Sequence, residues 1–537
     1  MMDRRTMLGL LATAAGSLQA SGSDLQAGNA YRISDDEGGA ELEWLSSSSF
    51  RFVQRWQRQA AIRKPIRGDK VPLTLRVERD SLRFTTRYLR VIVEKKPLRL
   101  KVYDAAGKLL LADITGPRKA NGRVVWERGR QETEKFWGLG PGARLDGQEP
   151  RAGIVVETGV PFLISSLGYG EYFRPAGFHR YVFGQPRRVE TPVGAENEFC
   201  LYYGPTPKEI LEEHMAVERP PGKVDWETFR LARRRPRGAW PLSNPKLDWD
   251  GLAELVRQLL RCSYSAILLP AVDLAAWRTA ETQIRRRASQ LAVHLPVVYD
   301  SAPETGADGA AVARERERWT PFLASYGYEM QERGFPLVRP LGMQYPRDAQ
   351  AVACDDAFML GDELLVAPVT CDAGERSIYL PAGQWTEWHT NARYEGRRVI
   401  KLAVAPEWTP LFVKNGSVVP VVEESGARRV AAHYYPKLAG EFFFYEEGSG
   451  ALTQLHAAPA GDLLRLEIEP AEERVWEWVV HHVPRPSRAT ARGAELSPAQ
   501  AREALAPDRW WYDESKGNLH LRVQPPSGSD HVIYVTF

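Results

Sequence analysis

The chain has 537 residues, of which 43% are hydrophobic and 26% charged, as in a folded globular protein with several domains rather than a disordered or fibrous one. Its 71 basic and 68 acidic residues nearly cancel, to a formal net charge of +3, so the charge gives no reason to expect a nucleic-acid partner. Sixteen tryptophans and twenty tyrosines are a heavy aromatic load. Sugar-binding clefts commonly use aromatic faces, and β-sandwiches also bury many of them.

The first 27 residues predict an export signal. Arg4 and Arg5 precede a short apolar run, and small residues follow it up to Ala20. This pattern is typical of the twin-arginine kind, and the apolar run is too short for a permanent membrane anchor. The mature protein is therefore expected in the periplasm or outside the cell, without a membrane span.

The four cysteines have no spacing typical of metal ligands. They are Cys200, Cys262, Cys354 and Cys371. An exported protein can form a disulfide, but four buried thiols explain the same residues. The sequence contains no phosphate-binding loop, metal cluster or Ser-His-Asp arrangement, so we expect neither a metal nor another cofactor.

Residues 28–219 predict an N-terminal β-sandwich. The stretch from Leu73 to Leu111 alternates apolar and polar residues and is punctuated by turn signals. A helix is expected only at the end of this block, in "TPKEILEEHMAVE", where Thr206 can cap and Ile210 and Met215 share a face. Many strands in one block favour a large antiparallel sandwich.

Residues 220–340 predict alternating helices and strands. "DWDGLAELVRQLL" has a helical apolar stripe, with Asp248 placed as its N-cap and Asp250 in its first turn. Strands are expected over 264–273 and 291–300, and helices over 275–290 and 310–334, the last ending at Gly334. These about 120 residues are too few for a closed (β/α)₈ barrel, which needs roughly 200–250, so they can form only about three repeats.

Residues 341–424 and 425–537 predict two C-terminal β-sandwich domains. "DELLVAPV", "RSIYLPAGQWTEW" and "PLFVKNGSVVPV" read as strands in the first, and "EFFFYEEGSGALTQL", "NLHLRV" and "HVIYVTF" in the second. The whole chain is thus expected to be a multidomain α+β protein.

Four segments resemble glycoside hydrolase family 31, the retaining α-glucosidases and α-xylosidases. They are "EKFWGLGPGARLDGQ", "VPFLISSLGYGEYF", "YYGPTPKEILEEH" and the long run from Gly334 to Trp388. The resemblance implies a galactose-mutarotase-like N-terminal sandwich, a (β/α) barrel and two C-terminal sandwiches. It also implies a role in carbohydrate metabolism, with an α-glycoside as the ligand.

The departures from the family concern its chemistry. A retaining glycosidase needs two carboxyl groups, one as nucleophile and one as acid and base. The family's Trp-x-Asp-Met-Asn-Glu nucleophile segment has no counterpart here, and its Gly-Asp acid/base pair becomes Leu242 and Ser243. A serine hydroxyl does not titrate near neutral pH and cannot act as the acid. The barrel is therefore expected to be a truncated remnant.

Other family site positions have also changed. Asp273 is retained, whereas Tyr299 stands in the place of a site arginine and Ser301 in that of a histidine. The resemblance implies substrate contacts from Trp240, Arg235, Asp273 and Tyr299. Glycines that let a substrate approach the backbone have become Ala271, Ala275 and Ala276. His294, a lone histidine within a predicted strand, is expected in the core.

Several carboxylates could still serve in catalysis. Asp273 and Asp300 both follow predicted strands, where barrel enzymes place their chemistry. An aspartate after a strand is also a common helix cap. Asp225 and Glu227 form a further pair in a loop. Asp248 and Asp250 could supply an acid, but starting a helix is the role their position favours.

Three functions fit these observations. The first is an exported relative of family 31 that lacks the usual dyad and at most binds carbohydrate. The second is an active α-glycosidase rebuilt around Asp273. The third is a scaffold, in which a homo-oligomer or another partner covers the open edge of the barrel remnant.

Overall fold

The computed structural model describes residues 26–33, 39–56, 70–145, 147, 153–174, 177–194, 196–218, 224, 226–242, 246–302, 306–423 and 429–537. The arginine pair and apolar run of the predicted export signal lie outside these residues. Within them, no helix is long and apolar enough to cross a membrane. The chain divides into a first unit of residues 1–131, 151–155 and 171–203, and a second unit of residues 132–150, 156–170 and 204–537.

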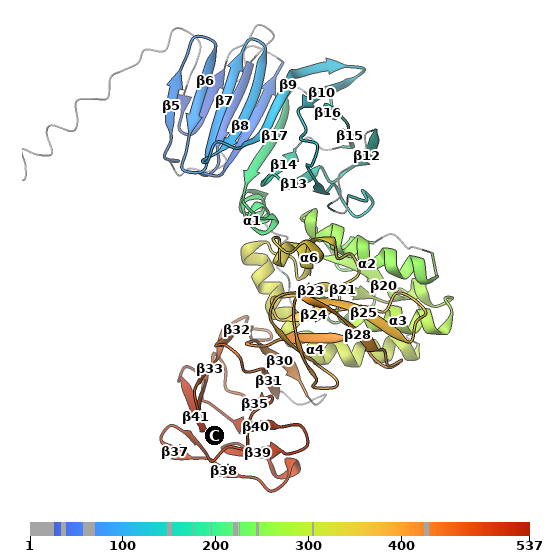
Figure 1. The fold of residues 1–537 in the computed structure, drawn as a ribbon, viewed down its shortest axis with the longest axis vertical. Coiled ribbons are helices and arrows are strands. Elements are labelled where there is room, and N and C mark those ends of the chain that lie inside the picture. Colours follow the sequence, from blue (N-terminus) through green and yellow to red (C-terminus); the bar gives the residue numbers. More distant parts are fainter. Residues whose placement is uncertain are drawn as a thin grey trace, which may run out of the picture. The chain divides into compact units, whose positions relative to one another are not determined.

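Two antiparallel sheets pack face to face in the first unit (Figure 1). The first contains β1 (Gln26–Ala27), β2 (Ala30–Ile33), β3 (Gly39–Trp44), β4 (Ser49–Arg55) and β17 (Glu196–Tyr203), in that order. The second contains β5 (Thr74–Val77), β6 (Ser81–Thr85), β7 (Leu89–Lys95), β8 (Leu98–Asp104), β9 (Leu109–Ala120), β10 (Arg123–Arg128), β16 (Arg187–Pro192) and β15 (His179–Phe183), neighbours following in that order. Between β10 and β17 along the chain also lie β11 (Phe136–Gly138), β12 (Ile154–Thr158), β13 (Phe162–Ser165) and β14 (Tyr169–Phe173).

The period-two pattern of the sequence sets the core of this sandwich. Alternate residues of β7 and β8 are buried, because every second side chain of a strand points to the same face. Aromatic rings join the two sheets: Phe52 of β4 lies 6.1 Å from Trp126 of β10 between ring centroids. The predicted N-terminal sandwich is confirmed.

A cluster of four buried charges lies inside the first unit. Glu171 accepts hydrogen bonds from Arg128 and, at 2.8 Å, from the Nη2 of Arg187. Asp113 lies 3.3 Å from the Nε of Arg128, and burial raises the pKa of its carboxyl to about 6. Two carboxylates thus face two guanidinium groups where water cannot screen them.

The second unit begins its helical part with α1 (Pro207–Glu218). Thr206 and Glu209 form a capping contact, in which both the backbone N–H and the hydroxyl of Thr206 donate to the Glu209 carboxylate at 2.9 Å. Ile210 and Met215 are buried on one face, as predicted. This helix is followed by η1 (Trp226–Phe229).

Four short strands form a parallel sheet in the order β18-β21-β20-β19. They are β18 (Leu231–Ala232), β19 (Trp240–Pro241), β20 (Pro270–Asp273) and β21 (Val297–Tyr299). The helices α2 (Trp249–Tyr264), α3 (Thr282–Val293) and α4 (Ala307–Arg333) gather around them (Figure 1), with the short η2 (Leu274–Trp277) directly after β20. Gly334 ends α4 with φ of +71°, as predicted.

Several element boundaries differ from the sequence prediction. The strand expected over 264–273 contains only Pro270–Asp273, because α2 continues to Tyr264, and α4 begins at Ala307 instead of residue 310. The helix expected over 275–290 is divided into η2 and α3, and the strand expected over 291–300 contains only Val297–Tyr299, because α3 continues to Val293. Leu291 and Ala292 are buried and extend the apolar face of α3. Pro296 then disfavours helix at Leu295 and sets the start of the strand.

The buried Arg316 of α4 stabilises the turn that leads from α3 to β21. Its guanidinium donates hydrogen bonds to five backbone carbonyls, those of Phe229, Ala292, Val293, Leu295 and Pro296. The side chain is fully buried. Arg316 therefore replaces the hydrogen bonds that the last carbonyls of α3 lack within their own helix.

The C-terminal part of the second unit is built from antiparallel and mixed sheets, which agrees with the β structure predicted for residues 341–537. A six-stranded sheet contains β22 (Val338–Pro340), β23 (Phe358–Leu360), β24 (Leu364–Val366), β29 (Leu411–Lys414), β26 (Gln384–Glu387) and β27 (Arg393–Glu395), next to the pair β25 (Glu375–Leu380) and β28 (Arg398–Ala403). Two more six-stranded sheets follow. The first contains, in this order, β30 (Val418–Val422), β31 (Val430–Tyr434), β35 (Trp476–Val480), β40 (Asn518–Val523), β39 (Arg509–Asp513) and β38 (Ser497–Pro498). The second contains, in this order, β32 (Gly440–Tyr445), β33 (Leu452–Ala460), β34 (Leu463–Glu469), β41 (His531–Thr536), β36 (Arg488–Ala491) and β37 (Ala494–Glu495). The short helices are α5 (Leu341–Gln344), α6 (Ala349–Ala353) and η3 (Arg502–Ala504).

One continuous hydrophobic core joins the helical part of the second unit to its last two sheets. Phe322 of α4 stacks on Phe442 of β32 with ring centroids 5.6 Å apart. All four cysteines carry thiols rather than disulfides: Cys200 and Cys262 are buried, Cys354 is half-buried and Cys371 is exposed. The expectation of buried thiols is thus right for two of them.

A buried carboxyl between β23 and β24 makes the stability of the second unit depend on pH. Burial raises the pKa of Glu363 to about 8, and the hydroxyl of Tyr326 donates to its Oε2 at 2.6 Å. The native pKa exceeds that of an unfolded glutamate, so stability falls as pH rises between about 4.5 and 8, by up to about 1.4 kcal/mol per pH unit.

Glu363→Gln should remove this dependence, because an amide does not titrate. We expect the melting temperature of the variant, relative to wild type, to increase steadily from pH 5 to pH 8. Thermal unfolding at half-unit steps of pH measures this difference. A difference that stays constant over the range would contradict the assigned protonation.

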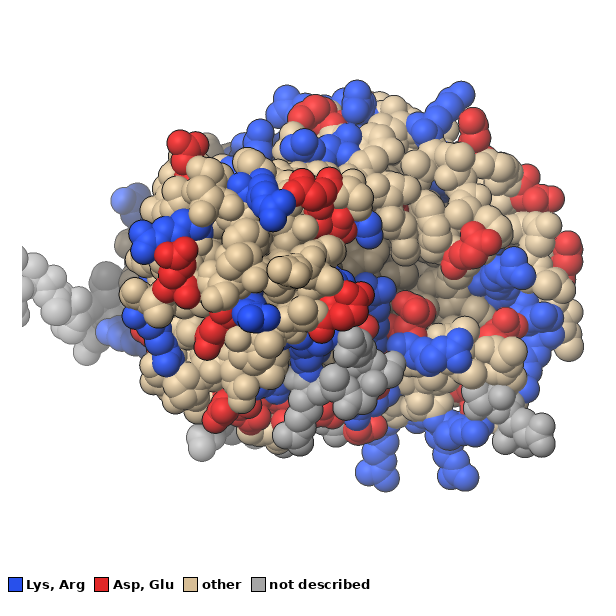
Figure 2. Space-filling model, turned by 90° about the horizontal axis from the view of Figure 1, so that it is seen from below, with Lys and Arg blue, Asp and Glu red and all other residues tan. Residues whose placement is uncertain are grey.

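Basic and acidic side chains are mixed on the surface. On the face drawn in Figure 2, Lys and Arg residues alternate with Asp and Glu residues, and neither sign covers it. This mixture agrees with the small net charge of the chain. Among the described residues on this face, no stripe of one sign, such as nucleic-acid binding uses, is visible.

Candidate functional site

The candidate site lies where the four parallel strands end. β18 pairs with β21, β21 with β20, and β20 with β19, all in parallel, so their carboxyl ends share one edge of the sheet. The strands end at Ala232, Pro241, Asp273 and Tyr299. Parallel α/β sheets place ligands and chemistry at this edge.

Asp273 ties two strand ends together. Its Oδ1 accepts hydrogen bonds from the backbone N–H of Ala275 at 3.0 Å and of Ser301 at 3.1 Å. Its Oδ2 accepts from the hydroxyl of Ser301 at 2.5 Å. The carboxylate caps η2, as the alternative reading of the sequence predicted, and holds the loop after β21.

Asp300 is buried and engages different partners. Its Oδ2 accepts from the guanidinium of Arg278 at 2.8 Å, and its Oδ1 from the backbone N–H of Ala302 at 3.3 Å. It lines a cleft of about 250 Å³ together with Arg285 and Asp308, which form an ion pair at 2.6 Å. Within the described residues, Asp273 and Asp300 share no hydrogen-bond partner. The ion pair with Arg278 was not anticipated from the sequence, because no spacing rule links the two positions.

Three of the four predicted substrate-binding residues lie close together, namely Asp273, Tyr299 and Arg235. Tyr299 and Asp273 face each other across the parallel pair of β21 and β20. Partial burial raises the pKa of the Tyr299 hydroxyl, the charge of Asp273 raises it further, and that of Arg235 lowers it. Trp240 lies on the neighbouring β19, where 42% of its surface is exposed. A cation and a carboxylate thus lie near Tyr299 at the strand ends, whereas Trp240 is level with Pro270 at the beginning of β20.

The remaining candidate residues, three carboxylates and the serine at the family's acid/base position, have structural roles or lie outside the described residues. Ser243 and Asp225 belong to the second group. Glu227 forms an ion pair with Arg230. Asp248 caps α2 by accepting from the N–H of Gly251 at 2.8 Å, which confirms the prediction that it starts the helix.

His294 is a core residue, as expected. It caps the C-terminal end of α3, and its ring lies 5.8 Å from that of Trp319. Burial lowers its pKa to about 3, so the imidazole is neutral at physiological pH. The described residues contain no group of three or more His, Cys, Asp or Glu that could hold a metal.

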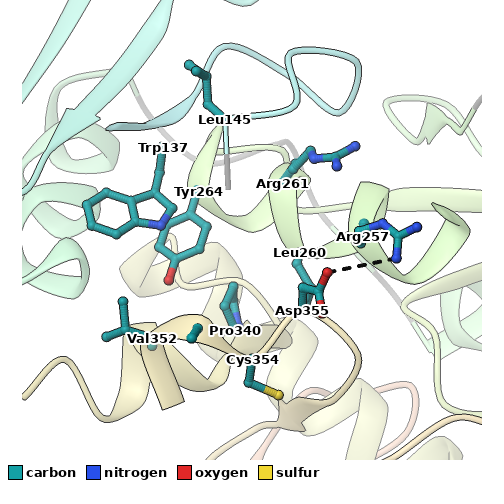
Figure 3. Close-up of a pocket in the computed structure, with 12 residues that line it drawn as sticks. Trp137, Leu145, Arg257, Leu260, Arg261, Tyr264, Pro340, Val352, Cys354 and Asp355 are labelled. Carbon is teal, nitrogen blue, oxygen red and sulfur yellow. Dashed lines mark ion pairs between the residues drawn. The ribbon is translucent and has the colours of Figure 1, made fainter. Parts of the chain in front are cut away.

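A cavity beside α2 is too small for a sugar (Figure 3). Trp137 stacks on Tyr264 at 5.6 Å on one side, and Arg257 forms an ion pair with Asp355 at 3.8 Å on another. The space between them is about 30 Å³, enough for about one water molecule. We assign it to packing.

Comparisons with known proteins agree with the fold. The family described as "Glycosyl hydrolase family 31 C-terminal domain" matches residues 334–419. Among curated proteins, the 1,6-alpha-glucosyltransferase of Sporosarcina globispora is 33% identical over 141 residues, which cover 24% of this chain and 11% of that protein. Alpha-glucosidase 2 of Bacillus thermoamyloliquefaciens is 26% identical over 207 residues, which cover 34% of this chain and 26% of that protein. The chain thus matches well under two thirds of the length of these relatives.

Solved structures extend the likeness along almost the whole chain. A GH31 dextranase of Flavobacterium johnsoniae complexed with isomaltotriose has a TM-score of 0.82 at 16% identity, covering 96% of this chain and 99% of that one. The GH31 alpha-xylosidase Xac1773 of Xanthomonas citri has a TM-score of 0.70 at 12% identity, covering 94% of this chain and 99% of that one. At such identities the likeness concerns the fold alone.

Proposed function

The chain belongs to glycosyl hydrolase family 31, and from this premise we propose that it is an exported member that binds carbohydrate without hydrolysing it. The observation that carries the proposal is the state of the two strand-end carboxylates. Asp273 is occupied by three donors from Ala275 and Ser301, and Asp300 by Arg278. A retaining glycosidase needs two carboxyl groups roughly 5–5.5 Å apart and aimed at one substrate bond. Carboxylates committed to separate local partners do not meet that need.

The sequence supports the same proposal from another side. Ser243 stands at the family's acid/base position, and no segment matches the family's nucleophile strand. We propose that residues 220–340 are a truncated (β/α) barrel, which the parallel order of β18, β21, β20 and β19 supports. The proposed domain boundaries follow residues 27, 219, 340 and 424. The arginine pair at the N-terminus supports export to the periplasm or beyond.

The ligand we propose is an α-glycoside at the strand ends. Trp240 offers an exposed aromatic face, while Arg235 and Tyr299 offer hydrogen-bond donors beside Asp273. Related solved proteins are complexed with isomaltotriose and with glucose, which supports a carbohydrate of this kind.

An active α-glycosidase rebuilt around Asp273 is the second candidate. Its support is the position of Asp273 at a strand end and its electrostatic interaction with Tyr299. A homo-oligomer that covers the edges of the parallel sheet is a further proposal, which light scattering of the purified chain tests.

Turnover of aryl α-glucosides, α-xylosides and α-galactosides separates the first two candidates. We expect no turnover above background for the wild type, for Asp273→Asn or for Asp250→Asn, the last being a control on an exposed aspartate of α2. Turnover by the wild type and Asp250→Asn that is lost in Asp273→Asn would overturn the proposal and establish the rebuilt site. Melting curves of the three proteins exclude misfolding as the cause.

A further inference from the structure

A second polar cleft, of about 570 Å³, lies in the C-terminal part of the second unit and shares no lining residue with the strand-end site. We call it the histidine cleft, because its walls contain five of the ten histidines of the chain. They are His389, His433, His481, His482 and His520. Its volume falls within the range of roughly 300–1,000 Å³ that small-molecule sites occupy.

A chain of hydrogen bonds fixes one wall of the cleft. The Nδ1 of His481 lies 3.1 Å from Asn391 Oδ1, and its Nε2 lies 3.0 Å from His433 Nδ1. The Nε2 of His433 in turn lies 3.1 Å from a carboxylate oxygen of Glu423. Both nitrogens of each imidazole are therefore used, so His433 and His481 build the wall instead of meeting a ligand.

The acidic groups of the cleft already have partners. Glu423 also accepts a hydrogen bond from Arg502 at 2.6 Å, and Arg502 lies 2.8 Å from the Nδ1 of His520. Asp513 accepts from the hydroxyl and the backbone N–H of Ser515 at 2.6 and 3.0 Å. Neither carboxylate is left to bind a cation.

Two basic groups in the same walls lack such partners. The guanidinium of Arg318 lies over the ring of Trp388 at 5.7 Å, and it makes no hydrogen bond or ion pair with the residues that the structure describes. The ammonium of Lys516 likewise has no ion pair within those residues. The unbalanced charge of the cleft is therefore positive, which favours an anionic ligand.

The cleft also holds one polar atom that has no partner in the protein. The Nε2 of His482 is buried without a hydrogen-bond partner in the described chain. His482 and Asn391 both have left-handed backbone conformations, with φ of +54° and +59°. Asparagine and histidine adopt this conformation more readily than other non-glycine residues, and the amide of Asn391 bonds to the backbone of Lys516. Trp511, which is half-buried, adds an aromatic surface.

We propose that the histidine cleft binds a saccharide unit that carries a carboxylate, such as a hexuronate. His482 presents a ring nitrogen to a sugar hydroxyl, and Trp511 presents a face to the ring. Arg318 receives the carboxylate, for which the planar guanidinium is suited, and Lys516 adds a second positive charge. A neutral sugar would offer the guanidinium of Arg318 no charged hydrogen-bond acceptor.

Glucuronate and glucose form a matched pair of probes, since they differ only at carbon 6. Isothermal titration of the full chain should show glucuronate binding at least about tenfold more tightly than glucose, because a hydrogen bond to a charged group contributes about 1.5–3 kcal/mol. Arg318→Gln should weaken glucuronate binding about tenfold or more, and Lys516→Gln less. Arg314→Gln, at an exposed position of the same helix, should leave it unchanged.

Three results would overturn the proposal: no binding of glucuronate, equal affinity for glucose, or full affinity in both Arg318→Gln and Lys516→Gln. Lys516 is exposed, so its variant remains informative should Arg318→Gln fail to fold. Asp273→Asn should retain glucuronate binding. That variant separates a failure here from a failure of the function proposed for the strand ends.

Discussion

Glu171→Gln is expected to lower the free energy of unfolding of the first unit by about 3–5 kcal/mol, because it breaks a buried charge cluster by removing one partner. Arg128 and Arg187 both donate to this carboxylate, and all three side chains are buried. Glutamine keeps the shape but removes the charge, so the two buried guanidinium groups would lose the carboxylate that they share. Water cannot reach them to compensate.

Chemical denaturation followed by the fluorescence of the first unit's tryptophans measures this loss. Glu78→Gln is the matched control, since it removes a glutamate from an exposed pair with Arg83 in the same unit. Exposed pairs contribute about 0–1 kcal/mol, so the control should stay near wild type. Equal losses in the two variants would show that burial does not govern the cost.

Arg316→Met is expected to destabilise the helical part of the second unit by about 3 kcal/mol or more, because each buried group left without a hydrogen bond costs about 1–3 kcal/mol. Methionine fills similar space but donates no hydrogen bond to the five carbonyls that Arg316 binds. Arg316→Lys should fall between wild type and Arg316→Met, because an ammonium has three donors in place of five.

Hydrogen exchange shows which residues are destabilised as well as by how much. Amides of residues 292–300 should lose protection in Arg316→Met, because these residues carry the turn from α3 into β21. Arg314→Met, at an exposed position of the same helix, controls for the loss of a positive charge. Uniform loss of protection across the second unit would contradict a local role for Arg316.

Features that depend on neighbouring residues could be predicted from the sequence. Asp248 caps α2 and Gly334 ends α4, because a capping carboxylate and a left-handed glycine act within one turn of helix. The end of α3 could not be predicted. The run from Leu291 to Val293 fits a helix face and a strand equally, and contacts from Arg316 in α4 decide between them.

The candidate sites also contain some features that could be predicted from the sequence and others that could not. That Asp273 could cap η2 was readable from the chain, but its bonds to Ser301 depend on the pairing of β20 with β21. The histidine cleft was not anticipated at all. Its histidines are separated by tens of residues, and only a register such as His433 beside Val479 in the parallel pair of β31 and β35 brings them together.

The edge strands of the parallel sheet, β18 and β19, are short, and this limits how another chain can pair with them. Each edge strand has two residues, and among the residues that the structure describes each pairs on one side only. A long bare edge is a template onto which another chain can add a strand, whereas two residues expose too few N–H and C=O groups to register an incoming one. A sheet with such ends resists β-augmentation, so a partner at these edges would have to pack through side chains instead of adding a strand.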